Sequence, residues 1–111
     1  MPRDSRVYLD DILDATRKIT TYTGSLSKSA FLEDEKTLDA VIRNLEVIGE
    51  AVKKLPEDLR AKHSAVEWKK IAGLLDILIH EYFGLDAEIV WDIVQNKVPA
   101  LDREVRTMLN Q

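Results

Sequence analysis

The chain has 111 residues, no cysteine, 45% hydrophobic and 32% charged residues, and a net charge of -4. This length suits one compact domain over residues 1–111, and the composition excludes a mostly disordered chain. Without cysteine, a disulfide framework, a thiolate metal site and a thiol nucleophile are all excluded. Because no signal region or long apolar run is present, we expect a cytoplasmic protein without a membrane segment.

Apolar residues recur three and four positions apart, which predicts helices and not strands. The first helix is expected at about residues 4–22, with Gly24 where a C-terminal cap belongs. A second, longer helix is expected from Asp34 to Lys54, and Pro56 ends it. Residues 56–61 are expected to form one further turn.

The third main helix is expected to begin near Val66, because Ser64 and Glu67 have the spacing of a capping box. Its body, residues 71–83, is apolar on nearly every side. This pattern is typical of a helix enclosed by its neighbours or by a second subunit.

Gly84 and Asp86 predict a tight turn, with Asp86 as the N-cap of the next helix. Pro99 is expected to interrupt that helix near residues 96–98. The sequence therefore predicts an all-α, up-and-down bundle of four to five helices.

Two polar side chains stand out in the apolar helix. At about 100° per residue, Asp76 and His80 lie about 40° apart, so the carboxylate is expected to orient the imidazole. Leu75 and Tyr82 fall on an adjoining sector, so the four residues are expected to line one cleft. The helix dipole favours protonated His80, which suits acid–base chemistry.

Structural roles are the alternative for each of these residues. His80 would then be a core histidine satisfied by Asp76 or a backbone carbonyl, and Tyr82 an ordinary core aromatic. His63 lies in a polar connection and is expected to be solvated. No metal site is predicted, because the two histidines lack the spacing of a ligand set. A basic segment is expected either to touch phosphate or to form a solvated face: Lys53, Lys54, Arg60, Lys62, Lys69 and Lys70.

Most of the chain resembles the HepT-like toxins of the HEPN superfamily. The resemblance is carried by residues 43–51 (RNLEVIGEA), 68–74 (WKKIAGL), 76–83 (DILIHEYF), 86–91 and 98–101. The family signature is an arginine, four residues, a histidine, one residue and a tyrosine. His80 and Tyr82 match it, Leu75 stands at the arginine position, and Asp76 matches the polar residue that follows.

The resemblance implies a homodimer that joins two signatures into a metal-independent endoribonuclease toxin. It also implies a partner, a minimal (MntA-like) nucleotidyltransferase antitoxin that uses ATP to adenylylate the signature tyrosine, here Tyr82. The chain itself is expected to need no cofactor. Arg43 and Glu50 match a second family motif as possible supporting residues, although an intrahelical charge network is the alternative.

Leu75 has neither the charge nor the donors of an arginine, so we expect this form to be nearly inactive against RNA. A second hypothesis is therefore a non-catalytic nucleotide- or substrate-binding subunit of a two-component nucleotidyltransferase. A third is a simple helical dimerisation module.

Overall fold

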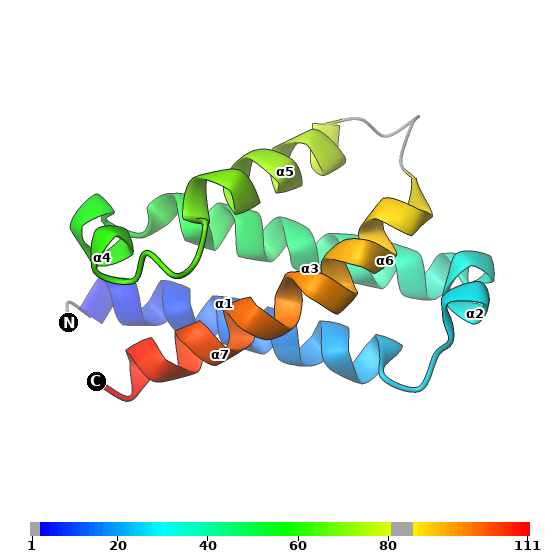
Figure 1. Ribbon diagram of the computed structural model, residues 1–111, viewed down its shortest axis with the longest axis horizontal. Helices are drawn as coiled ribbons and strands as arrows, with labels where there is room; N and C mark the ends of the chain where they lie inside the picture. Colours follow the sequence, from blue (N-terminus) through cyan, green and yellow to red (C-terminus); the bar gives the residue numbers. More distant parts are fainter. Residues whose placement is uncertain (1–2, 81–85) are drawn as a thin grey trace.

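The computed structural model describes residues 3–80 and 86–111, which fold into seven helices. Two long helices, α1 (Arg3–Thr23) and α3 (Glu35–Lys54), pack side by side along the molecule (Figure 1). α5 (Trp68–His80) packs on α3, and α7 (Val98–Leu109) packs on α1. The expected all-helical bundle is confirmed for the described residues. The remaining helices are α2 (Lys28–Glu33), α4 (Glu57–Lys62) and α6 (Ala87–Asn96).

The two long helices and the α6–α7 break follow the sequence closely. Asp34 caps α3, because its carboxylate accepts a 3.0 Å hydrogen bond from the Thr37 amide. Leu55 is extended ahead of Pro56 and ends the helix, as predicted. Asp86 caps α6, and Pro99 lies in the first turn of α7. These elements were predictable because capping residues and prolines act locally.

Helix α2 is an element that the sequence pattern did not predict. Ser27 caps it by accepting a 3.2 Å hydrogen bond from the Ala30 amide. Its one buried residue, Phe31, packs against Trp91 of α6 with ring centroids 5.1 Å apart. Six residues with one buried side chain are too short to give a helical periodicity, so a contact distant in sequence stabilises this helix.

The capping box predicted at Ser64 is wrong, and α5 begins at Trp68, two residues later than expected. The amide of Ile71 donates to the carbonyl of Glu67 at 3.0 Å, so Glu67 occupies the N-cap position. The indole Nε1 of Trp68 donates to the carbonyl of His63 at 3.0 Å. This hydrogen bond favours a compact turn ahead of the helix.

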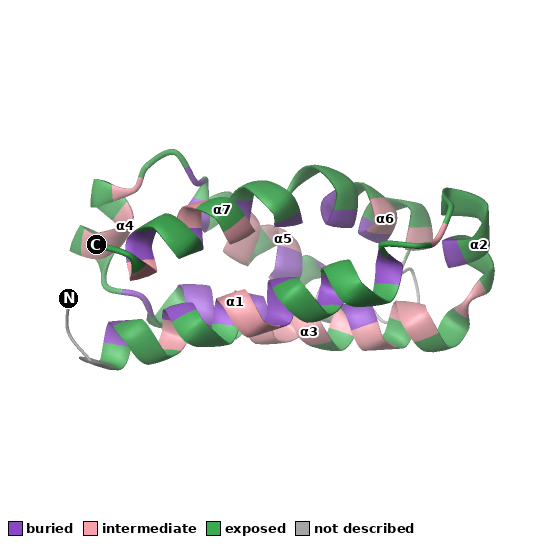
Figure 2. Ribbon diagram, turned by 90° about the horizontal axis from the view of Figure 1, so that it is seen from below, coloured by how far each residue is buried: buried purple, intermediate pink, exposed green. Residues whose placement is uncertain are grey.

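Buried residues gather between the helices, whereas exposed residues cover the outside of the bundle (Figure 2). The hydroxyl of Thr16, which is fully buried in α1, donates a 2.7 Å hydrogen bond to Asp102 of α7. Helix α5 differs from the expected enclosed helix, because Leu75 and Leu78 are buried but Gly73 and Ile77 are exposed. One face of α5 is therefore open in this chain. No helix within the described residues is both long and apolar enough to cross a membrane.

Candidate functional site

Leu75, at the signature arginine position, lies in the core between α5 and α3 and is only 2% exposed. A Cβ built on Gly49 would lie 3.2 Å from the Leu75 Cβ, so the two helices approach closely at this point. Asp76 and His80, in contrast, are accessible to solvent. The expectation that Leu75 lines a cleft with them is wrong for this chain. Successive side chains of a helix point about 100° apart, so Leu75 points into the core while Asp76, the next residue, reaches solvent.

The Asp76 carboxylate binds Lys53 of α3 and not the imidazole, which corrects the expected carboxylate–histidine pair. The Lys53 ammonium also lies 3.6 Å from the Glu50 carboxylate. The hydrogen bond to Asp76, followed by the charges of Asp76 and Glu50, raises the pKa of Lys53 above its usual value. Lys53 is therefore a permanent cation between two carboxylates, and it joins α3 to the helix that carries His80.

His80 is exposed, and its Nδ1 lies 2.8 Å from the backbone carbonyl of Asp76, one turn earlier. A carbonyl only accepts, so Nδ1 carries the donated proton. In the neutral ring the Nε2 lone pair is then available to take a proton. The alternative of a core histidine is wrong, because the His80 side chain is exposed. The backbone carbonyl partner that this alternative named is nevertheless present.

The other predicted site residues divide into two groups. Tyr82 lies outside the described residues, so its place beside His80 stays a prediction. Arg43 and Glu50 are exposed on α3 and form intrahelical ion pairs, Arg43 with Glu46 at 3.8 Å and Glu50 with Lys53. Among the described residues these are two separate ion pairs, and no contact joins Arg43 to Glu50 as one charge network would require.

His63 was expected to be solvated, and that expectation is wrong. Its side chain is 9% exposed, and Nδ1 lies 3.1 Å from the Glu104 carboxylate of α7. The connection between α4 and α5 is thus held against the C-terminal helix. A partner 41 positions away left no local signal in the sequence.

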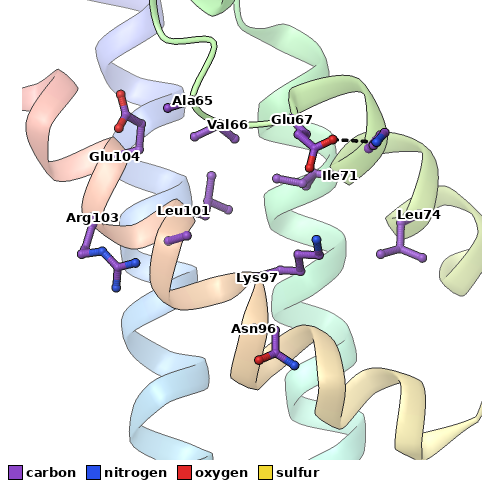
Figure 3. Close-up of a pocket in the computed structure, with 12 residues that line it drawn as sticks. Ala65, Val66, Glu67, Ile71, Leu74, Asn96, Lys97, Leu101, Arg103 and Glu104 are labelled. Atoms are coloured by element: carbon purple, nitrogen blue, oxygen red, sulfur yellow. Dashed lines mark ion pairs between the residues drawn. The ribbon is translucent and has the colours of Figure 1, made fainter.

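A cavity of about 340 Å³ lies between α5 and the α6–α7 junction (Figure 3). Lys97 extends into it, and Glu67 pairs with Lys70 at 2.7 Å on its α5 side. Ile71 lines this cavity and lies nine residues before His80, so the two side chains point about 180° apart on α5. The cavity is therefore separate from the His80 surface. Among residues 3–80 and 86–111, no three His, Asp or Glu side chains are grouped to hold a metal ion.

Lys53 is the site residue that sequence reasoning missed. It was visible only as one member of the basic segment, and its contact with Asp76 joins positions 23 residues apart. No motif pairs these two positions, because their meeting depends on the packing of α5 against α3. The assembled site is an exposed cluster of Glu50, Lys53, Asp76 and His80, in which His80 can transfer a proton.

The HepT-like ribonuclease family matches residues 12–108. A candidate RNase of Methanocaldococcus jannaschii is 51% identical over 110 residues, covering 98% of this chain and 91% of that protein. A candidate ribonuclease HepT of Thermococcus cleftensis is 42% identical over 101 residues, covering 91% and 92%. The fold also resembles a tri-AMPylated HEPN toxin of Shewanella oneidensis, solved in complex with an MNT antitoxin, with a TM-score of 0.73 and 21% identity over all of both chains. The chain therefore belongs to the HepT-like ribonuclease family and has the fold of a HEPN toxin.

Proposed function

We propose that this protein is the toxin of a toxin–antitoxin pair and that it cleaves RNA with His80 as the acid–base residue. The observation that carries the proposal is the hydrogen bond from His80 Nδ1 to the Asp76 carbonyl, in a chain of the HepT-like ribonuclease family. This bond fixes the ring orientation and leaves Nε2 exposed to a substrate. An RNase of this kind, with an ATP-using partner, would act in the cytoplasm.

The proposed reaction is a transesterification within RNA. The 2′-hydroxyl attacks the adjacent phosphorus, and His80 Nε2 takes its proton. The bond from phosphorus to the 5′-oxygen breaks, and that oxygen takes a proton from water. The hydroxide left behind takes the proton held by His80, and the products are a 2′,3′-cyclic phosphate and a 5′-hydroxyl. We propose that no metal takes part, so cleavage is expected to persist in excess EDTA.

Leu75 is expected to weaken this activity. Loss of one donor to a developing oxyanion typically costs a factor on the order of 10²–10³ in rate, and leucine offers no donor. In Leu75→Arg, the guanidinium would have to extend from the close α3–α5 contact to the surface, as arginine side chains commonly do.

The test compares RNA cleavage by the native chain, Leu75→Arg and Leu75→Arg/His80→Ala. Cleavage by the arginine variant that disappears with His80 supports the proposal. A folded Leu75→Arg dimer that leaves RNA intact contradicts it. Circular dichroism and light scattering on the same samples establish folding and oligomeric state.

We propose that the active form is a homodimer neutralised by a nucleotidyltransferase antitoxin that adenylylates Tyr82. The open face of α5 supports the dimer, because Ile77 is 57% exposed there beside Gly73 and His80. The Shewanella HEPN toxin, which is tri-AMPylated and bound to an MNT antitoxin, supports the kind of partner. A bulky anionic nucleotide beside His80 would repel RNA phosphate.

A second candidate is a non-catalytic subunit that presents a nucleotide or substrate to a nucleotidyltransferase. The buried, uncharged Leu75 favours it, because the signature cation is missing. This candidate predicts nucleotide binding by the native chain and no RNA cleavage by Leu75→Arg. The cleavage test above therefore separates the two functions.

A further inference from the structure

We propose that Lys53 supplies the cation that Leu75 does not, and that Asp76 restrains it by occupying its ammonium group before RNA binds. This inference rests on the proposed ribonuclease function. It assigns phosphate contact to a residue of α3, whereas the family signature lies on α5.

Position and exposure support the assignment. Within the described part of the chain, residues 75–80 form one ion pair, which joins Asp76 to Lys53. Its ammonium binds the Asp76 side chain, and the backbone carbonyl of Asp76 holds His80. Asp76, which binds the cation, and His80, which carries the imidazole, are therefore about one helical turn apart on α5, roughly 6 Å along its axis. The side chains of Lys53 and Asp76 are 39% and 40% exposed, so a phosphate has access to both.

The local charge explains the restraint. Lys53 lies between Glu50 and Asp76, so these three groups sum to one negative charge before RNA arrives. An incoming phosphate must compete with Asp76 for the ammonium group. Asp76→Asn would weaken that competition, because the amide oxygen still accepts a hydrogen bond but carries no charge, and it would preserve the backbone carbonyl that His80 uses.

The neighbouring residue provides a matched control. Lys54 carries the same charge one position later on α3, but its ammonium lies over the Tyr8 ring of α1, 5.6 Å from the ring centroid. Lys54→Met therefore removes the same charge from the chain while leaving the Lys53–Asp76 contact in place. A difference in activity between the two methionine variants therefore reports the effect of where the charge lies and not the effect of net charge.

The first experiment measures cleavage of a labelled, mixed-sequence single-stranded RNA. In the native chain we expect Lys53→Met to lower the cleavage rate by about 10- to 100-fold, toward the cost of a lost oxyanion donor. Lys54→Met is expected to stay within about twofold of native, and Asp76→Asn to increase the rate several-fold by the competition argument. In the Leu75→Arg chain, Lys53→Met is expected to cost less than about threefold, since the arginine then supplies the charge.

The second experiment measures binding of a 2′-O-methyl RNA, which lacks the attacking hydroxyl. Log affinity falls as log salt rises, and loss of one phosphate contact makes this negative slope shallower by about 0.7 for a single strand. We expect this change for Lys53→Met and not for Lys54→Met. This readout does not depend on activity.

Three results would overturn the assignment of Lys53. If Lys53→Met and Lys54→Met lower the cleavage rate equally, the position of Lys53 has no particular importance. If Lys53→Met lowers the rate by the same factor in the native and Leu75→Arg chains, the role of Lys53 is structural. A native chain that cleaves RNA no faster than its His80→Ala variant would also reject the assignment. If Leu75→Arg is active in the same assay, the proposed function still stands. If neither the native chain nor a folded Leu75→Arg dimer cleaves RNA, the proposed function and this inference fail together.

Discussion

Gly49 of α3 faces Leu75 of α5 so closely that a Cβ on the glycine would lie 3.2 Å from the leucine Cβ. This contact sets the separation of the two helices that bear the candidate site. Leu75 Cβ is attached directly to the α5 backbone, so it moves only if the helix moves. The small size of Gly49 therefore permits Lys53 and Asp76 to meet beside it.

We expect Gly49→Ala to destabilise the protein. Overpacking typically costs about 1–3 kcal/mol, and the higher helix propensity of alanine offsets about 1 kcal/mol of that. Gly73→Ala is the matched control, because no heavy atom among the described residues of the same chain lies within 4 Å of its added Cβ. It should stabilise the helix by about 0.5–1 kcal/mol. Urea unfolding at one fixed protein concentration measures both, and a stabilising Gly49→Ala would contradict the close contact.

The N-cap of α3 predicts a pH-dependent contribution to stability. The Thr37 hydroxyl and amide donate to the Asp34 carboxylate at 2.7 and 3.0 Å and hold the Asp34 pKa below its usual 3.8. The contribution is therefore present above pH 3.8 and is lost as the pH falls through the lower folded-state pKa.

Asp34→Ala is accordingly expected to be less stable than the native chain near neutral pH and to approach it in acid. Asp34→Asn retains a capping oxygen without a titrating carboxylate and serves as the control. The measurement is the urea midpoint of all three proteins across the acidic range. A native-minus-alanine difference that does not change with pH would contradict the assigned role of the charge.

The open face of α5 predicts a dimer-disrupting substitution. Ile77→Glu would place a charge in the expected interface, and we expect the mass from light scattering to fall to that of one chain while the helical signal remains. Val7, at 50% exposure on α1, gives the control Val7→Glu, which should remain dimeric. An unchanged mass for Ile77→Glu would exclude this face as the dimer interface.

The proposed modification predicts a mass change. Incubation with the nucleotidyltransferase partner and ATP should add one or more adenylyl units to the native chain and none to Tyr82→Phe. Tyr22, which is 40% exposed on α1, provides the control Tyr22→Phe, which should gain the same mass as the native chain. Intact-mass spectrometry measures the three proteins, and an adduct on Tyr82→Phe would rule out the assigned tyrosine.

Local sequence signals predicted the long helices and their ends well. Capping residues and prolines act on the backbone within a few residues, so the helix ends that they predict are the ones found in the fold: Asp34, Pro56, Asp86 and Pro99. The capping box at Ser64 failed because packing of Trp68 against the preceding turn moved the start of α5. A local pattern therefore fixed a helix boundary only where no tertiary contact competed with it.

The candidate site was less predictable than the fold. Helical geometry placed Asp76 and His80 on neighbouring sectors of α5, but it could not reveal that Lys53 of α3 would take the Asp76 carboxylate. Similarly, no residue near His63 in the sequence indicated that its side chain would contact Glu104. Partners contributed by another helix emerge only from packing.

Helix α5 is attached to the described bundle chiefly through α3, whereas α3 is flanked by both α1 and α5. A segment secured on a single side can detach in a partial unfolding event that leaves the α1–α3 pair intact. The amide protons of α5 should then exchange with solvent sooner than those of α3. A second subunit seated on its free side would slow that exchange, so assembly and local order of the His80 helix are expected to rise together.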